Sequence, residues 1–356
     1  MAAVEGLRPD EDLARETGPS MKLRVGLVGL GDAWEQRHRP ALRALADRFE
    51  VRAVCEPVRH RAELAAAEFR AATVDGFRAL AEREDVDAVL VFSADWYGWL
   101  PILAACDAGK AIYVGGGVTF EPEQAETIKQ RVDESGIAFM AEFPRRHWAA
   151  TLRLKELIAT RLGPPRLLFC HQRLAQPERR GPNASHAAPR AYVEEMVELV
   201  DWCCYVVGEE PTAVTGLLHR CGADATEEDY QMMSLDFSPH GASGTGAVAQ
   251  ISCGRYFPAR WREAIHYRPL AALQVACQRG MAFVDLPSAL VWFDEAGRQQ
   301  ESLDCERPVG ELLLTQFHRA VTSLVRKTRD LEDACRALKI VELARRSHHE
   351  GRRMKL

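Results

Sequence analysis

The chain has 356 residues, 47% of them hydrophobic and 27% charged, which is typical of an ordinary globular protein large enough for two domains. A net charge of −5 argues against a nucleic-acid partner or an acidic membrane surface. No apolar run reaches the ~20 residues of a membrane span, and the polar N-terminus lacks the apolar centre of a signal peptide. We therefore expect a cytoplasmic protein with a disordered tail over residues 1–20.

The ten cysteines show no metal-ligand or disulfide pattern. None forms a Cys-x-x-Cys pair, and most lie within apolar segments. A zinc site or a disulfide framework needs clustered spacing. The sequence therefore predicts no metal site and reduced, buried thiols.

Short apolar strands alternate with helical segments in the first part of the chain. The strands are predicted at "LRVGLVGLG", "EVRAVCEP", "VDAVLVFSAD", "AIYVGGG" and "IAFMAEF", in that order between residues 23 and 143. Strands and helices alternating at this spacing favour βαβ units. We predict an α/β domain over residues 21–142, with a doubly wound parallel sheet.

The pattern changes after residue 143. A helix at "ATLRLKELIATRLG" precedes the strand "PRLLFCHQR" and the long helix "AYVEEMVELVDWCCYVVG". Five further strands are expected, at "TAVTGLLHR", "YQMMSLDFS", "GAVAQISCGRYF", "ALQVACQRG" and "MAFVDLPSALVWF". Short turns between strands favour an antiparallel sheet. We predict a second, α+β domain over residues 143–356, closed by two C-terminal helices.

The first strand ends in a glycine pair that is typical of dinucleotide binding. Gly29 and Gly31 precede a helix, where backbone N–H groups can approach a pyrophosphate, so Asp32, Ala33 and Trp34 join them as candidate cofactor residues. Trp34 stands at the third fingerprint position, where a small residue is usual, and residues 32–39 are expected to form a long loop. We expect Gly31→Val to block the pyrophosphate without unfolding the chain.

Basic residues follow the glycine pair. Arg37, His38 and Arg39 could hold a phosphate or could be solvated charges, and we favour solvated charges.

The second strand ends in Glu56, the acidic residue expected to bind the ribose 2′-hydroxyl. A carboxylate there disfavours a 2′-phosphate, so NAD is predicted over NADP. Arg59 and Arg61 are positive charges that could bind a 2′-phosphate, so NADP stays an alternative cofactor.

Over about residues 22–350 the whole pattern resembles the Gfo/Idh/MocA family of NAD(P)-dependent oxidoreductases. The stretch "DAVLVFSADWYGWLPILAACDAGKAIYV" is similar to the family's third strand, cofactor loop and following helix, and "DLEDACRALKIVELARRSHHEG" to its closing helix. The resemblance implies an N-terminal Rossmann domain and an open-faced C-terminal antiparallel sheet. It also implies a small sugar- or polyol-like substrate. Because an uncovered apolar sheet needs a partner, we expect a homo-oligomer formed through that sheet.

The residues that carry the family's chemistry differ in this chain. The usual Glu-Lys-Pro aligns with Gly115 to Gly117, so the position of the lysine is Gly116. On the long helix of the second domain, the Asp and His positions are Glu194 and Glu198. The cofactor loop reads Ser93-Ala94-Asp95-Trp96-Tyr97-Gly98, from which Ser93, Asp95 and Trp96 join Gly115 as cofactor candidates.

Replacement groups are available nearby. Glu198 and Glu194 lie four residues apart on one helix face, and "EFPRRHW" adds His147; these three are our catalytic candidates. The substrate candidates are Arg145, Arg146, His186 and Arg190. The glutamates could instead be a solvated helix face, and the arginines could pair with surface carboxylates.

Two hypotheses follow from these residues. The chain is an oxidoreductase with an unusual acid/base set, or a non-catalytic relative that acts as a binding or assembly subunit. Turnover of common sugars and polyols is expected to be weak unless Glu198 or His147 compensates for the missing groups.

Overall fold

The computed structural model describes most of the chain. The described residues are 21–93, 96–115, 120, 122–175, 187–220, 229–239, 241–242, 244–257, 263, 267, 271–303, 307–323 and 329–356.

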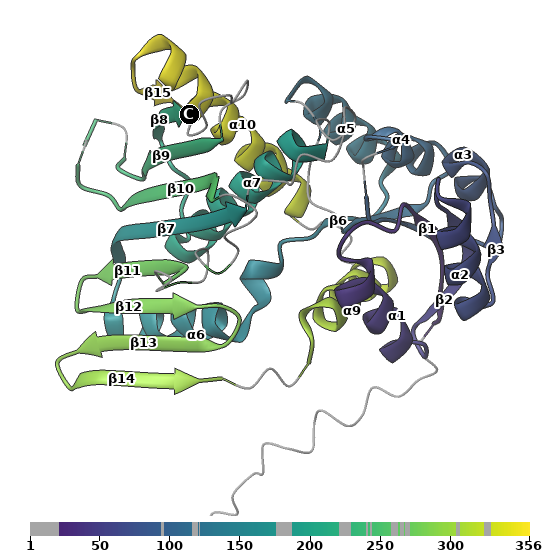
Figure 1. The fold of residues 1–356 in the computed structure, drawn as a ribbon, viewed down its shortest axis with the longest axis horizontal. Helices are drawn as coiled ribbons and strands as arrows, with labels where there is room; N and C mark the ends of the chain where they lie inside the picture. The colour runs from purple at the N-terminus through teal and green to yellow at the C-terminus, as the bar shows by residue number, and fades with distance from the viewer. Residues whose placement is uncertain are drawn as a thin grey trace, which may run out of the picture.

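A six-stranded parallel sheet forms the N-terminal part of the molecule (Figure 1). Its strands are β1 (Leu23–Val28), β2 (Phe49–Cys55), β3 (Ala72–Thr73), β4 (Ala88–Val91), β5 (Ala111–Val114) and β6 (Phe139–Ala141). The order is β3-β2-β1-β4-β5-β6, which confirms the doubly wound sheet predicted from the alternating pattern. Chain order reverses beside β1, and in such sheets ligands bind beyond the carboxyl ends of the strands at this point.

Helices cover both faces of this sheet. One face carries η2 (Trp34–His38), α1 (Arg39–Ala44), α2 (Arg59–Phe69) and α9 (Val309–Thr322), and the other carries α3 (Phe77–Ala81), α4 (Leu100–Asp107) and α5 (Pro122–Ser135). Helix α9 comes from the far end of the chain and lies beside α1 (Figure 1). Its Leu313, Leu314 and Phe317 are fully buried in the core of this face. The expected boundary at residue 142 therefore does not separate the two cores completely.

A nine-stranded sheet forms the second part, in the order β14-β13-β12-β11-β7-β10-β9-β8-β15. Its strands are β7 (Pro165–Ala175), β8 (Ala213–His219), β9 (Tyr230–Asp236), β10 (Val248–Phe257), β11 (Leu273–Cys277), β12 (Gly280–Asp285), β13 (Ala289–Asp294), β14 (Gly297–Ser302) and β15 (Met354–Lys355). Neighbouring strands are antiparallel except β7 and β10, which run parallel. The long connection from β7 through α7, β8 and β9 returns the chain in the same direction.

Among the described residues, helices cover one face of this sheet. They are α6 (Ala149–Leu157), η4 (Ile158–Leu162), α7 (Ala187–Val207) and α10 (Asp330–Glu350), with η3 (Pro144–His147) linking the two sheets. On the opposite face Leu167, Phe169, Leu217 and Phe293 are 40–45% exposed, while their sequence neighbours on these strands point inward. The open-faced sheet expected from the sequence is therefore confirmed.

Helix α10 joins the two parts. One continuous hydrophobic core extends from Val28 and Ile112 of the parallel sheet, through Ala337 of α10, to Val275 of the second sheet. Among the described residues, no helix has the length and apolar character needed to cross a membrane.

Candidate functional site

The turn after β1 requires both of its glycines. Gly29 has φ +63° and Gly31 has φ +44°, in the left-handed region that favours glycine. A Cβ on Gly31 would lie 2.3 Å from the backbone oxygen of Phe92, and one on Gly29 would lie 2.8 Å from that of Ser93. This geometry argues against the expectation that Gly31→Val leaves the fold intact, because the new side chain would collide with the backbone at the end of β4.

Backbone donors remain free in this turn. The amide of Gly29 donates to Cys55 O at 2.9 Å, whereas those of Gly31, Asp32 and Ala33 have no acceptor within the described residues. Unpaired N–H groups at the start of a helical segment, beyond the end of a parallel strand, suit a phosphate. The residues of the turn therefore fit the pyrophosphate of a dinucleotide.

Trp34 belongs to the core. Its indole is 3% exposed and lies against Phe69 and Phe92, with ring centroids 6.0 and 5.7 Å apart. The wide π-helix η2 accommodates the ring where a small residue would allow a tighter helix. The expected long loop over residues 32–39 is therefore helical from Trp34 onward, and only the backbone of Trp34 can serve a cofactor.

Glu56 turns inward and braces the glycine turn. Its carboxylate accepts hydrogen bonds from Leu30 N at 2.8 Å and Val58 N at 3.2 Å, and its side chain is 3% exposed. The Arg61 guanidinium lies 3.9 Å from this carboxylate and is 45% exposed. The carboxylate already accepts two backbone hydrogen bonds and is less available to a ribose hydroxyl. This weakens the argument that Glu56 selects NAD over NADP.

The segment after β4 is partly described. Ser93 is half-buried beside the glycine turn, and Trp96 is 70% exposed. Tyr97 packs edge-on against Phe77, with its hydroxyl 3.6 Å from the thiol of Cys55. The predicted cofactor residue Asp95 lies outside the described residues.

The start of the three-glycine stretch is packed against His38. The His38 ring stacks on Phe92 at 4.1 Å, and its Nε2 donates to Gly115 O at 2.9 Å. A Cβ on Gly115 would come within 3.0 Å of Tyr113, Phe92 and His38, so these rings occupy the space of a side chain there. Gly116 and Gly117 lie outside the described residues.

Two of the three basic residues after the turn are not solvated charges, contrary to our expectation. His38 is fully buried, and Arg37 Nε lies 2.6 Å from Oε1 of the enclosed Glu142. Only Arg39, which pairs with Glu35 and Glu68 in a partly exposed position, fits the expected solvated charge.

Burial shifts the pKa values of His38 and Glu142 strongly, in opposite directions. It lowers the pKa of His38 to about 3, with Arg37 adding to the effect, so the ring is neutral. It raises the pKa of Glu142 to about 8, although Arg37 opposes the shift. Burial and the Glu142 carboxyl also raise the pKa of Tyr113. The carboxyl ends of β5 and β6 therefore enclose an acid whose proton is held near neutral pH.

Glu198 lies where η3 meets α7. Its carboxylate and that of Glu195 both pair with Arg145, and the Glu198 side chain is 22% exposed. Burial raises the pKa of Glu198 in spite of Arg145. Glu194 is half-buried one turn earlier on α7. The structure thus brings Arg145 and Glu198 together, whereas sequence reasoning assigned them separate roles.

Arg146 is held by acidic residues of α7 and α10. It pairs with Asp201 and with Asp333, the latter at 2.7 Å, and it lies 4.7 Å from the centroid of the Phe143 ring. This supports the alternative that Arg146 pairs with protein carboxylates, although the partners are largely buried. Asp201 was not anticipated, since nothing in the sequence distinguishes it on the apolar helix.

His147 contacts α9 and, among the described residues, makes no hydrogen bond or ion pair with Glu198. Its Nδ1 lies 3.4 Å from Nε2 of Gln316 on α9, and burial followed by Arg146 lowers its pKa to about 4. So weak a base is poorly matched to proton transfer near neutral pH. His186 and the side chain of Arg190 lie outside the described residues.

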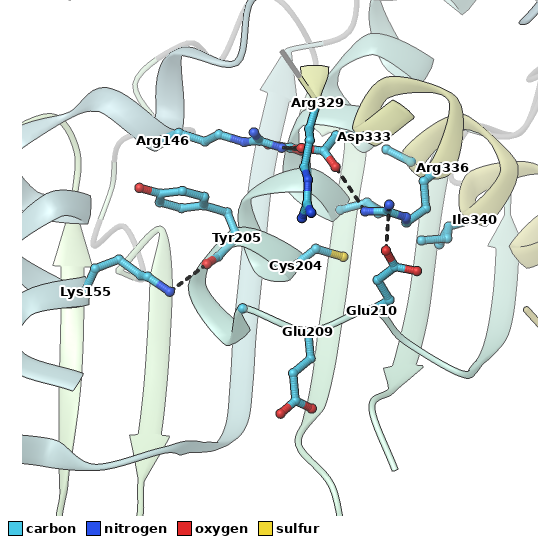
Figure 2. Close-up of a pocket in the computed structure, with 14 residues that line it drawn as sticks. Arg146, Lys155, Cys204, Tyr205, Glu209, Glu210, Arg329, Asp333, Arg336 and Ile340 are labelled. Carbon is cyan, nitrogen blue, oxygen red and sulfur yellow. Dashed lines mark hydrogen bonds and ion pairs between the residues drawn. The ribbon is translucent and has the colours of Figure 1, made fainter. Parts of the chain in front are cut away.

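A cavity of about 320 Å³ opens between α6, α7 and α10 (Figure 2). Asp333 bridges Arg146 and Arg336, and Arg336 also reaches Glu210. Lys155 caps the end of α7 by donating to Tyr205 O at 3.0 Å. Among the described site candidates, only Arg146 lines this cavity, and the cations of the cavity are largely neutralised by protein acceptors. We therefore place the candidate site at the ends of β1, β4, β5 and β6.

Potential metal ligands do not cluster in the part of the chain that the structure describes. No group of three or more His, Cys, Asp or Glu side chains there could hold an ion.

Comparisons with known proteins agree with this geometry. Residues 23–143 match the Gfo/Idh/MocA family model, described as an oxidoreductase family with an NAD-binding Rossmann fold. An inositol 2-dehydrogenase of Cereibacter sphaeroides is 32% identical over 196 residues, which are 53% of this chain and 55% of that protein. A dTDP-3,4-didehydro-2,6-dideoxy-alpha-D-glucose 3-reductase of Actinomadura kijaniata is 34% identical over 34% of this chain and 36% of its own length. The chain thus matches about half or less of the length of these curated relatives.

Solved structures share the fold over nearly the whole chain. The aldose-aldose oxidoreductase of Caulobacter crescentus, complexed with glycerol, superposes with a TM-score of 0.79 at 17% identity, covering 94% of this chain and all of the other. A putative NADPH-dependent oxidoreductase of Desulfitobacterium hafniense gives a TM-score of 0.78 at 18% identity, covering 94% and 98% of the two chains. The Rossmann part of the chain thus matches the Gfo/Idh/MocA oxidoreductase family, and nearly the whole chain shares the two-part fold of the solved structures.

Proposed function

We propose that the protein is an NAD(P)-dependent oxidoreductase that interconverts a hydroxyl and a carbonyl group on a small sugar- or polyol-like molecule, with Glu198 as the group that moves the hydroxyl proton. The observation that carries the proposal is the state of Glu198. It is a partly exposed carboxyl whose pKa is raised by burial, at the junction of η3 and α7. An acid or base tuned toward neutral pH is what such a reaction needs.

The turn after β1 is the proposed binding site for the dinucleotide. The free amides of Gly31, Asp32 and Ala33 would hold its pyrophosphate, and the bound nicotinamide would supply or accept the hydride. NAD(H) is the proposed cofactor, in line with the family model. NADP(H) stays open because Glu56 is turned inward and Arg61 is exposed beside it.

The substrate class rests on the relatives. The curated relatives are named as an inositol 2-dehydrogenase and a dTDP-deoxysugar 3-reductase, so their names specify a cyclic polyol and a sugar nucleotide. Arg145 pairs directly with Glu198, and its side chain is only 11% exposed. We therefore expect Arg145 to hold the Glu198 carboxylate in place rather than to bind the substrate.

A non-catalytic role is the second candidate. The rings around Gly115 fill the space of a side chain, and Arg145 and Arg146 are both paired with protein carboxylates. These features suit a protein that keeps the nucleotide site and acts as a binding subunit. In either case we propose a homo-oligomer formed through the exposed apolar face of the second sheet, which light scattering of the purified protein tests directly.

Two measurements on the unmodified protein separate the candidates. Native mass spectrometry detects retained NAD(H) or NADP(H), and a panel of inositols, hexoses and deoxysugars is followed at the NADH absorbance. Bound dinucleotide with turnover supports the oxidoreductase, and bound dinucleotide without turnover across the panel supports the binding subunit. Absence of binding to either dinucleotide would contradict both candidates as stated.

A further inference from the structure

A cluster of charged groups links the end of the parallel sheet to α7, and acidic groups outnumber basic ones in it. We define this junction cluster as Arg37, Glu142, Arg145, Glu195 and Glu198. Arg37 pairs with Glu142 at 2.6 Å, and Arg145 pairs with both Glu195 and Glu198. Full ionisation would leave two guanidinium groups facing three carboxylates in a largely enclosed place.

The two halves of the cluster act on each other. The charge of Arg37 stabilises the ionised form of both Glu142 and Glu198, whereas a charge on Glu198 destabilises the ionised form of Glu142. Their surroundings differ, however. The Glu142 side chain is 1% exposed, whereas that of Glu198 is 22% exposed.

Among the residues that the structure describes, the groups packed around the cluster do not supply the missing positive charge. By element they are His38 on η2, Tyr113 on β5, Arg146 on η3, Asp201 on α7, and Asp330 and Asp333 on α10. His38 is neutral, and Arg146 is shared among three aspartates. An uncompensated buried carboxylate is costly, and binding a proton removes that cost.

We propose that Glu142 and Glu198, one from each half of the junction cluster, hold one proton between them at neutral pH, with the enclosed Glu142 as a positioning residue that keeps this proton available to Glu198. A pair of this kind titrates as a unit, so the proton belongs to both carboxyl groups. The use of the proton in catalysis rests on the proposed function, but its presence does not. A group that can give or take one proton near neutral pH suits either direction of a hydroxyl–carbonyl interconversion.

The test is infrared spectroscopy of the cofactor-free protein with isotope-labelled glutamate, read at the band of the protonated carboxyl at about pH 7. The wild type should show the amplitude of about one protonated glutamate. Glu142→Gln and Glu198→Gln should each abolish the band, because two carboxylates then face two guanidinium groups. Glu134→Gln removes an exposed glutamate of α5 that lies outside the cluster, and it should leave the band unchanged.

Absence of the band from the wild type would overturn the proposal, and so would a band that survives in either cluster variant. If Glu142→Gln fails to fold, the wild-type amplitude and the more exposed Glu198→Gln still decide. No dinucleotide or substrate enters the measurement. Failure here therefore leaves the oxidoreductase proposal to its own assay, and an inactive protein with the band would remove only the catalytic use of the proton.

Discussion

The glycine turn after β1 offers a sharp test because two costs can be separated there. Replacing Gly31 by alanine places a β-carbon on a backbone at φ +44°, which costs ~1–2 kcal/mol for an ordinary residue. The same β-carbon would lie 2.3 Å from Phe92 O, a backbone atom that cannot turn aside. Relieving such an overlap costs a further ~1–3 kcal/mol. We therefore expect Gly31→Ala to lower the free energy of unfolding by about 2–5 kcal/mol.

Gly136 provides the matched control. It has φ +63°, and no heavy atom lies within 4 Å of the position that a β-carbon would take, so Gly136→Ala should cost only the conformational ~1–2 kcal/mol. Urea unfolding followed by circular dichroism measures both variants against the wild type. Equal destabilisation by the two substitutions would refute the argument that the backbone of β4 dictates glycine at position 31.

Three further predictions concern the same edge of the sheet. Glu56→Ala should weaken the binding of NADH and of NADPH equally, by about tenfold, because a charged hydrogen bond worth ~1.5 kcal/mol no longer supports the glycine turn. Calorimetry measures both affinities, and a changed ratio between them with NADH binding intact would contradict this prediction. Gly115→Ala should lower the free energy of unfolding in urea by ~1–3 kcal/mol, because three rings must shift. Gly76→Ala has open space around it and should lower the same quantity by less than about 1 kcal/mol. Equal losses would count against the packing argument. Since folded Glu142 keeps a proton that the unfolded chain releases, the stability of the wild type should fall as pH rises from 4.5 toward about 8, and this slope should be smaller in Glu142→Gln; identical slopes would show that Glu142 does not bind this proton.

Much of the fold could be predicted from hydrophobic patterning. The strands of the parallel sheet are nearly continuous apolar runs, so β1, β2, β4 and β5 stand out in the sequence. The edge strand β14, "GRQQES", has no apolar signal and was not anticipated. The segment "MAFVDLPSALVWF" was expected as one strand and forms β12 and β13, since both halves are apolar and the turn at Pro287 is short.

The site was less predictable because its key contacts join distant segments. The pairs Arg37–Glu142 and Arg145–Glu198 connect residues far apart in the chain, and no local spacing marks them. His38 looked like a surface charge between two arginines, but its ring is buried against Phe92. A carboxyl residue at the end of an apolar strand, as in "IAFMAEF", was the one local signal that an acid would be enclosed there.

The most direct test of the central claim is the rate of NAD(P)-linked turnover by Glu198→Gln, measured with the best substrate of the panel beside the wild type and Glu134→Gln. Losing a positioned acid/base group should reduce kcat by ~10²–10⁴-fold, while Glu134→Gln keeps the wild-type rate. Dinucleotide affinity, measured in parallel, should be the same in all three proteins. Robust turnover that survives Glu198→Gln would contradict the assignment of the proton transfer to Glu198.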